Sequence, residues 1–167
     1  MIDPRTAAPV AIEPAENPAD MTIMRELFRE YQAGVGSCEC FVDFEAEIAG
    51  LPGRYTAPTG CLLIARADTD IAGGVALGSI DINDISAGVE MKRLYVRPAW
   101  RGTGLGRRMA ERVIEEARSL GQSRLYLDTL PVMTEARALY ASLGFAKCPP
   151  YSAEPTPGAI CMELVLA

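Results

Sequence analysis

Three glycines alternate with other residues in the segment Arg101–Gly106 (RGTGLG), and this composition suits the binding of an anion. Glycine allows the backbone to approach a ligand closely and to turn several N–H groups toward one point. The residues that follow have the apolar spacing of a helix, and a helix N-terminus carries a partial positive charge. The segment therefore predicts a phosphate-binding loop at the start of a helix.

Two arginines, Arg107 and Arg108, follow the glycines in what would be the first turn of this helix. The helix macrodipole disfavours cations at that end. Their placement is understandable if an external anion meets them, and the alternative is that they pair with Glu111 and with solvent. We favour the anion and include Arg107 in its expected site.

The spacing of the glycines departs from two common nucleotide-binding patterns. No Lys-Ser/Thr pair ends the loop as in a P-loop, and Arg107 stands where a dinucleotide-binding loop has its third glycine. The pattern that is present, Arg-x-x-Gly-x-Gly after a strand and before a helix, resembles the acetyl-CoA pyrophosphate loop of the GCN5-related N-acetyltransferases. Lys92–Pro98 (KRLYVRP) looks like the strand before that loop, and Ala136–Phe145 (ARALYASLGF) looks like the family's later helix.

The resemblance implies acetyl-CoA as co-substrate and assigns a binding role to two parts of the chain. The backbone of Leu94, Tyr95 and Val96 would hydrogen-bond the pantetheine arm, with the N–H of Tyr95 or of its neighbour polarising the thioester. The glycine loop would hold the pyrophosphate through its N–H groups. The implied loop residues are Arg101, Gly102, Thr103, Gly104, Leu105, Gly106 and Arg107.

Acetyl transfer to an amine needs one group that protonates the departing thiolate and another that takes a proton from the amine. Tyr140 matches the tyrosine that the family uses as general acid, and a packed ring with a hydrogen-bonded hydroxyl is compatible with that role. Glu90 is the candidate base, directly or through water; the alternative is an exposed strand residue paired with a cation. Asp128, at the end of another expected strand, is a second acidic candidate.

The strand Val89–Val96 decides which side chains face the cofactor. Strict alternation gives two sets, with Glu90, Lys92, Leu94 and Val96 on one face and Met91, Arg93 and Tyr95 on the other. A bulge in this strand, which the resemblance implies, would reverse the assignment beyond the break.

Met133 is a departure from the family pattern. Family members often have Asn at this place, seven residues before the helix tyrosine, where it contacts the cofactor. That contact is missing here or is supplied by another residue, for which Thr134 is the candidate.

The rest of the sequence describes a single domain over residues 1–167 that positions these groups. Helices are expected at 18–33, 44–49, 105–120 and 133–143, and strands at 10–12, 61–65, 71–82, 89–96, 124–128, 145–148 and 160–166. Asn17 or Asp20 can cap the first helix and Asp43 the second. The order indicates an α/β (α+β) fold. The resemblance implies a mixed, mostly antiparallel sheet of about six to seven strands, flanked by about four helices and splayed after the fourth strand.

Composition narrows the function classes. The formal net charge of −6 argues against general nucleic-acid binding, which needs a basic face. No apolar run is long enough to span a bilayer and the N-terminus lacks a signal-peptide core, so we expect a cytoplasmic protein with no membrane partner. The chain has five cysteines and no histidine. Cys38 and Cys40 form a lone C-x-C with no second Cys pair at zinc-ligand spacing, so we expect no metal site.

Three functions are therefore compared. The leading one is transfer of an acetyl group from acetyl-CoA to a primary amine of a small molecule or protein. The second is a non-catalytic acyl-CoA sensor or structural module, and the third, nucleotide binding, is opposed by the glycine spacing. We expect the acceptor site to be built from the early helices, the connector at 51–58 and the loop at 149–158. The sequence leaves a monomer and a homodimer equally open.

Overall fold

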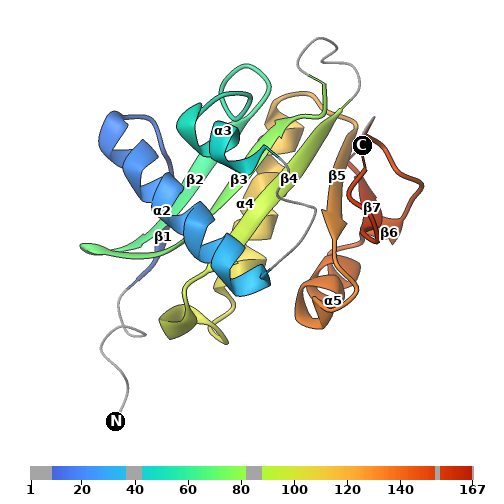
Figure 1. Ribbon diagram of the computed structural model, residues 1–167. Helices are drawn as coiled ribbons and strands as arrows, with labels where there is room; N and C mark the ends of the chain where they lie inside the picture. Colours follow the sequence, from blue (N-terminus) through green and yellow to red (C-terminus); the bar gives the residue numbers. More distant parts are fainter. Residues whose placement is uncertain (1–8, 37–42, 82–87, 153–154, 167) are drawn as a thin grey trace.

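The computed structural model describes residues 9–36, 43–81, 88–152 and 155–166. Seven strands form one sheet in the order β1-β2-β3-β4-β5-β7-β6 (Figure 1). The strands are β1 (Ala11–Pro14), β2 (Cys61–Ala67), β3 (Asp70–Ser79), β4 (Val89–Val96), β5 (Arg124–Thr129), β6 (Ala146–Lys147) and β7 (Ile160–Val165). Only the β4–β5 pair among these is parallel, which confirms the mixed, mostly antiparallel sheet.

Within the described ranges four α-helices flank the sheet, as expected: α2 (Pro18–Val35), α3 (Phe44–Ala49), α4 (Leu105–Ser119) and α5 (Thr134–Ser142). A short 3-10 helix, η3 (Pro98–Trp100), links β4 to the glycine loop. Figure 1 shows α2 and α3 on one face of the sheet and α4 on the other. The chain thus forms three layers around a central sheet.

The first turn of α2 is closed by a reciprocal pair of side chains. Asn17 accepts the backbone N–H of Asp20 at 2.9 Å, and Asp20 accepts that of Asn17 at 3.4 Å. Both expected capping residues therefore take part, as in a capping box. The expectation for Asp43 is wrong, because its backbone is left-handed (φ 59°) and its side chain makes no capping hydrogen bond to α3.

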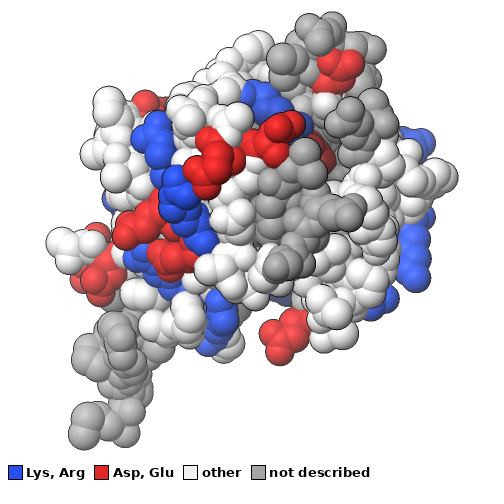
Figure 2. Space-filling model, viewed as in Figure 1, with Lys and Arg blue, Asp and Glu red and all other residues white. Residues whose placement is uncertain are grey.

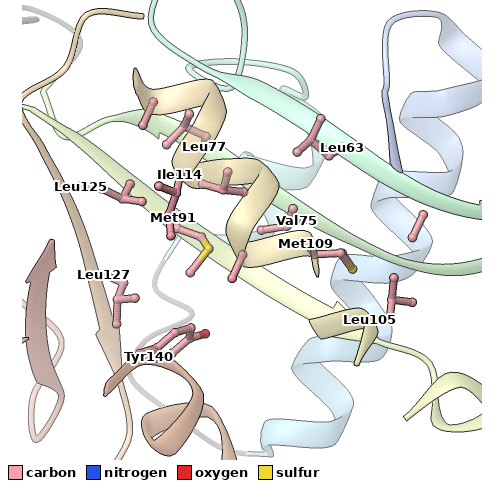
Figure 3. Packing of buried hydrophobic residues seen from close by; sticks show 14 of the residues in the cluster. Leu63, Val75, Leu77, Met91, Leu105, Met109, Ile114, Leu125, Leu127 and Tyr140 are labelled. Atoms are coloured by element: carbon pink, nitrogen blue, oxygen red, sulfur yellow. The ribbon is translucent and has the colours of Figure 1, made fainter. Parts of the chain in front are cut away.

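Two apolar cores lie on the two faces of the sheet. The larger packs α4 and α5 against the sheet through residues such as Met91, Met109 and Leu125 (Figure 3). The smaller packs α2 and α3 against β2 and β3, with Met24, Leu27 and Phe28 at its centre. Because α4 carries a continuous apolar stripe from Leu105 to Ala117, it anchors the glycine loop firmly to the sheet.

The sheet opens beyond the first residues of β4 and β5. Their pairing is limited to Val89 with Leu125 and Glu90 with Tyr126. From Met91 onward no strand of the described residues pairs with the edge of β4 that faces β5, as the expected splay at the fourth strand requires. This opening is where a ligand can reach the backbone of the central strand.

A bulge in β4 lies opposite Val75 of β3. Gly74 pairs with Tyr95 and Ala76 with Lys92, so two β4 residues oppose one on β3, and Arg93 has a left-handed backbone (φ 60°). Leu94 and Val96 consequently join Met91 in the larger core, whereas Tyr95 packs in the smaller one. Strict alternation was therefore wrong beyond the bulge, and the implied reversal is confirmed.

The face that carries α2 and α3 has interspersed acidic and basic side chains (Figure 2). Pairs such as Arg29 with Glu45 at 3.0 Å and Arg97 with Glu30 at 2.6 Å account for part of this mixture. Among the helices of the described residues, none combines the length and apolarity that crossing a membrane demands.

Candidate functional site

The glycine loop adopts a conformation that glycine makes possible. Gly102 and Gly104 have positive φ values of 76° and 84°, which residues with a side chain rarely adopt. A Cβ atom added at either position would have no heavy atom within 4 Å, so this side of the loop is open. Thr103 closes the turn by donating its hydroxyl to the carbonyl of Trp100 at 2.6 Å.

The backbone N–H groups of this loop are available for a ligand. Arg101 donates its N–H to the carbonyl of Pro98, and Arg108 donates its N–H to that of Gly104. Between them, the N–H groups of residues 102–107 donate to no acceptor in the described part of the chain. Several unbonded N–H groups at the start of a 15-residue helix make a site of positive potential that suits a phosphate group.

Other residues of the chain already bind the two arginines that follow the loop, Arg107 and Arg108. Arg108 donates to the carbonyl of Val10 at 2.7 Å, which ties the start of α4 to the segment before β1. Arg107 donates to the hydroxyl of Ser142 and lies 3.7 Å from Glu111. The side chain of Arg107 is 45% exposed beside the loop, so it can still face an anion, whereas Arg108 is committed to the fold.

A groove of about 570 Å³ runs from the glycine loop along the open edge of β4. Gly102, Gly104 and Gly106 line it at one end and Met133 and Ala136 at the other. Because Arg97 donates its N–H to Ala72 of β3 and backbone groups alternate along a strand, Leu94 and Val96 direct theirs away from β3. The N–H groups of Leu94 and Val96 therefore face the opening, whereas that of Tyr95 points toward β3.

The Val96 carbonyl on this edge already has a partner. Arg101 donates its Nε–H to this oxygen at 2.9 Å, and its guanidinium lies 5.7 Å from the ring centre of Tyr95. Arg101 therefore joins the end of β4 to the loop through its side chain, in addition to its place in the loop backbone.

A smaller cavity of about 80 Å³ adjoins the groove between β4 and β5. Tyr31, Leu94, Met133 and Ala136 line both spaces, so one leads into the other. The cavity is further lined by polar residues that come from four different elements, namely Lys92, Arg93, Asp128, Thr129, Tyr140 and Thr156.

Tyr140 reaches this cavity from α5. Its ring is buried in the larger core (Figure 3). It packs edge-on against Phe145, with 5.8 Å between ring centres. Its hydroxyl has no hydrogen-bond partner among the described residues, although buried phenols usually have one. Burial raises the pKa of Tyr140 well above its usual value, with smaller contributions from Tyr31 and the Asp128 carboxylate, so the phenol keeps its proton at neutral pH.

Asp128 faces the same cavity from the end of β5 and is only half-buried. Its carboxylate accepts no hydrogen bond and joins no ion pair within the described residues. It lies close enough to Tyr140 for its charge to raise the pKa of that phenol. A carboxylate with free lone pairs beside a protonated phenol can accept a proton or hold an ammonium group.

Glu90 lies beyond the cavity wall and is fully engaged. Its Oε1 lies 2.7 Å from Arg54 Nη2 and 3.8 Å from Lys92 Nζ, and its Oε2 accepts the hydroxyl of Tyr151 at 2.7 Å. The alternative interpretation of Glu90 was an exposed strand residue paired with a cation. The pairing with a cation is observed, but the side chain is buried and only 7% exposed. Proton transfer to Glu90 from the cavity would have to pass through Tyr151 or water.

Met133 and Thr134 occupy the start of α5, where the groove and the cavity meet. Met133 is the N-cap residue but makes no side-chain capping bond, and its sulfur accepts the hydroxyl of Thr129 at 3.5 Å. Thr134 lines the groove. Its hydroxyl makes no hydrogen bond within the described part of the chain, which leaves it available to a ligand.

Several residues of the site escaped sequence reasoning. Tyr31, Arg54 and Tyr151 contribute through contacts between segments far apart in the chain, and no motif marks them. Lys92 stands in the motif Lys92–Pro98, but the motif gave its side chain no role. Lys92 and Asp128 each stand two residues beyond the last pair of the β4–β5 ladder, and the sequence alone does not reveal this register. Cys38 and Cys40 lie outside the described residues, and no cluster of potential metal ligands occurs within those residues.

The chain is similar in sequence to known N-acetyltransferases. The sequence model of the Acetyltransferase (GNAT) family matches residues 21–145. An uncharacterized N-acetyltransferase of Schizosaccharomyces pombe is 33% identical over 95% of this chain and 96% of its own length. The uncharacterized N-acetyltransferase YjgM of Escherichia coli is 28% identical over 78% of this chain and 76% of its own.

A solved structure shares the fold. The yncA protein of Salmonella typhimurium, solved with its cofactor acetyl-CoA, superposes with a TM-score of 0.73 and 22% identity, covering 95% of this chain and 94% of that one. This likeness shows that the two chains share the overall fold.

Proposed function

The chain belongs to the Acetyltransferase (GNAT) family, and we propose that it transfers the acetyl group of acetyl-CoA to a primary amine of a small molecule or a peptide. The proposal requires three things of the site: a grip on the cofactor, a proton for the departing sulfur and a place for the amine. Each has a structural counterpart.

The groove fits the cofactor in its polarity and position. The free N–H groups of residues 102–107 would receive the pyrophosphate, with Arg107 beside them. The backbone groups of Leu94 and Val96 that face away from β3 would hydrogen-bond the pantetheine arm, and one of their N–H groups would polarise the thioester carbonyl. The reactive end of the cofactor would then lie at the junction of the groove and the cavity.

Tyr140 would act as the general acid at this junction. As the amine nitrogen forms its bond to the acetyl carbon, the carbon–sulfur bond breaks and the thiolate takes the phenolic proton. The amine nitrogen gives up one proton to a carboxylate or to water, and solvent returns a proton to Tyr140. The observation that carries this proposal is the phenol of Tyr140, which faces the cavity beside the groove and has no hydrogen-bond partner among the described residues.

Two carboxylates are candidates for the base. Asp128 lines the cavity with its oxygens free, and Glu90 could act only through Tyr151 or water because both of its oxygens are engaged. This difference favours Asp128 for direct contact with the amine. Glu90 is retained as a remote base whose first task is to hold Arg54 and Tyr151 in place.

The acceptor would enter from the side of α2 and the last loop. Tyr31 of α2 and Thr156 of the loop line the cavity. The connector at 51–58 lines a separate, larger cavity of about 940 Å³ together with Glu47 and Ser79. A long or peptidic acceptor could extend toward this second space.

A second candidate function, acyl-CoA binding without turnover, is favoured by one observation. Met133 stands where the family often has Asn, so one cofactor contact of active members differs here. The two functions make the same prediction for binding and opposite predictions for chemistry.

Thermal unfolding with added ligand, followed by an acceptor screen, tests the proposal. Acetyl-CoA at 100 times its Kd should stabilise the protein by about 2.7 kcal/mol. For a chain of this size that stabilisation corresponds to a Tm increase of roughly 5–10 °C. ATP and NAD should give no comparable shift. Thiol release with amino acids, polyamines, aminoglycosides or peptides would support transfer, whereas tight binding without turnover across that panel would support the sensor.

A further inference from the structure

The small cavity carries opposite charges on facing strands. Glu90 and Tyr126 form the last pair of the parallel β4–β5 ladder, and two residues further along each strand stand Lys92 and Asp128. Both line the cavity. Because the strands part at this point, no ion pair joins Lys92 to Asp128, and the cavity separates a cation from an anion that continued pairing would have brought together.

Neither of these charges has a close partner in the described residues. Asp128 has none, and the only ion-pair partner of Lys92 is Glu90, at 3.8 Å. Arg54 already balances the charge of Glu90 at 2.7 Å, and the hydroxyl of Tyr151 engages the other oxygen of Glu90 at 2.7 Å. The lysine is thus able to meet a second anion.

Arg93, the other cation of the cavity wall, is in a different situation. Its Nε–H donates to Glu47 at 3.2 Å, and its guanidinium lies 5.3 Å from the ring centre of Phe44 in the smaller core. Its side chain is 6% exposed. Lys92 is therefore the cation of this wall that is best placed to receive a ligand.

A molecule that fills the gap must satisfy both charges, since a charge buried against an unmatched group is costly. A simple alkylamine would neutralise the charge of Asp128 but would place only its hydrocarbon part beside the Lys92 ammonium. An amine that also carries a nearby carboxylate neutralises both charges, because its nitrogen lies beside Asp128 and Tyr140 and its carboxylate points toward Lys92. The cavity of about 80 Å³ is several times the roughly 10–15 Å³ that one water needs, which is room for such a head group.

We propose that the acceptor is an amino acid or a close analogue, whose carboxylate is bound by Lys92 and whose amine is received by Asp128. This inference rests on the proposed N-acetyltransfer and names its substrate class. It makes Lys92 a specificity residue that touches the acceptor but takes no part in the chemical step.

The test compares acceptors that differ only in the carboxylate. Each of the common L-amino acids is assayed against its carboxamide, with acetyl-CoA saturating, by thiol release and by the mass of the product. For the best acceptor we expect kcat/KM at least tenfold higher for the acid. The carboxamide's amine is less basic and therefore more often neutral at the assay pH, so reactivity alone would favour the amide.

Two variants assign that preference to Lys92. Lys92→Met keeps the length of the side chain and removes its charge; it should lower kcat/KM for the acid at least tenfold, mainly through KM, and change that for the amide less than twofold. Lys92→Arg should recover most of the loss. Lys147→Met, at the exposed lysine of β6, is the matched control and should leave both acceptors unchanged. Acetyl-CoA affinity should be the same in all four proteins.

The possible failures are distinct. Amides used as well as acids, or a Lys92→Met variant that loses both equally, would overturn the amino-acid assignment while leaving N-acetyltransfer intact. Acetyl-CoA binding with no turnover of any amine, polyamines and peptides included, would overturn the proposed function and this inference with it.

Discussion

The phenol of Tyr151 donates a 2.7 Å hydrogen bond to Oε2 of Glu90, which ties the last loop of the chain to the central strand. The other oxygen of Glu90 lies 2.7 Å from Arg54, which belongs to the connector between α3 and β2. One buried carboxylate thus joins two segments that approach the site from opposite ends of the sequence. We interpret its first role as holding these segments in place.

The main effect of Glu90→Gln should therefore be a lower free energy of unfolding. Breaking a buried ion pair leaves Arg54 uncompensated, and we expect the free energy of unfolding in urea to fall by about 3 kcal/mol. Tyr151→Phe should cost about 2 kcal/mol, because it removes one hydrogen bond to a charged group. The double variant should lose less than the sum, which shows that the two side chains are coupled. A large fall in kcat for Glu90→Gln with unchanged stability would instead assign Glu90 to proton transfer.

Tyr140→Phe should lower kcat by about 10²–10³, as expected when a general acid is removed. The Kd for acetyl-CoA should change less than twofold, because the ring stays in place and the hydroxyl has no hydrogen bond to lose within the described part of the chain. Steady-state kinetics and calorimetric titration measure the two quantities. Tyr126→Phe makes the same chemical change on β5, outside both cavities, and should be close to wild type; equal losses in the two variants would deny Tyr140 a special role.

Met133→Asn should improve the start of α5 and the grip on the cofactor. An Asn at the N-cap accepts a backbone N–H of the first turn and typically stabilises a helix by about 1 kcal/mol. Its amide would also line both the groove and the cavity, so we expect acetyl-CoA to bind several-fold more tightly. Thr134→Val should weaken binding in the wild type and less so in the Met133→Asn background. Weaker binding by Met133→Asn would show that the sulfur contact with Thr129 matters more than a polar cap.

Much of the fold was predictable because its signals are local. The stripe from Leu105 to Ala117 and the glycines before it predict the helix and its open N-terminus, and the strand at Val89–Val96 agrees with the structure residue for residue. Asn17 was found as a cap because it stands directly before a helical pattern. The same rule failed for Asp43, whose backbone is left-handed and whose side chain makes no capping hydrogen bond to α3.

The chemistry of the site was less predictable, because it depends on contacts between distant segments. Alternation alone assigned Leu94 to the wrong face, since the left-handed Arg93 shifts the strand by one residue. Glu90 was proposed from its place on the central strand, but Arg54 and Tyr151, which engage it, lie 36 residues before and 61 residues after it in the chain. The free carboxylate of Asp128 and the nearby Lys92 follow from the splay of two strands, which no sequence period reports.

The central claim is that the N–H groups of residues 102–107 receive the pyrophosphate of acetyl-CoA while its thioester lies beside Leu94 and Val96. Amide chemical shifts measured during an acetyl-CoA titration, with no acceptor present, test it most directly. The account predicts that the largest changes fall on Gly102–Arg107 and on Leu94–Val96. Saturation with acetyl-CoA that leaves these amides unmoved and shifts those of another surface would contradict it.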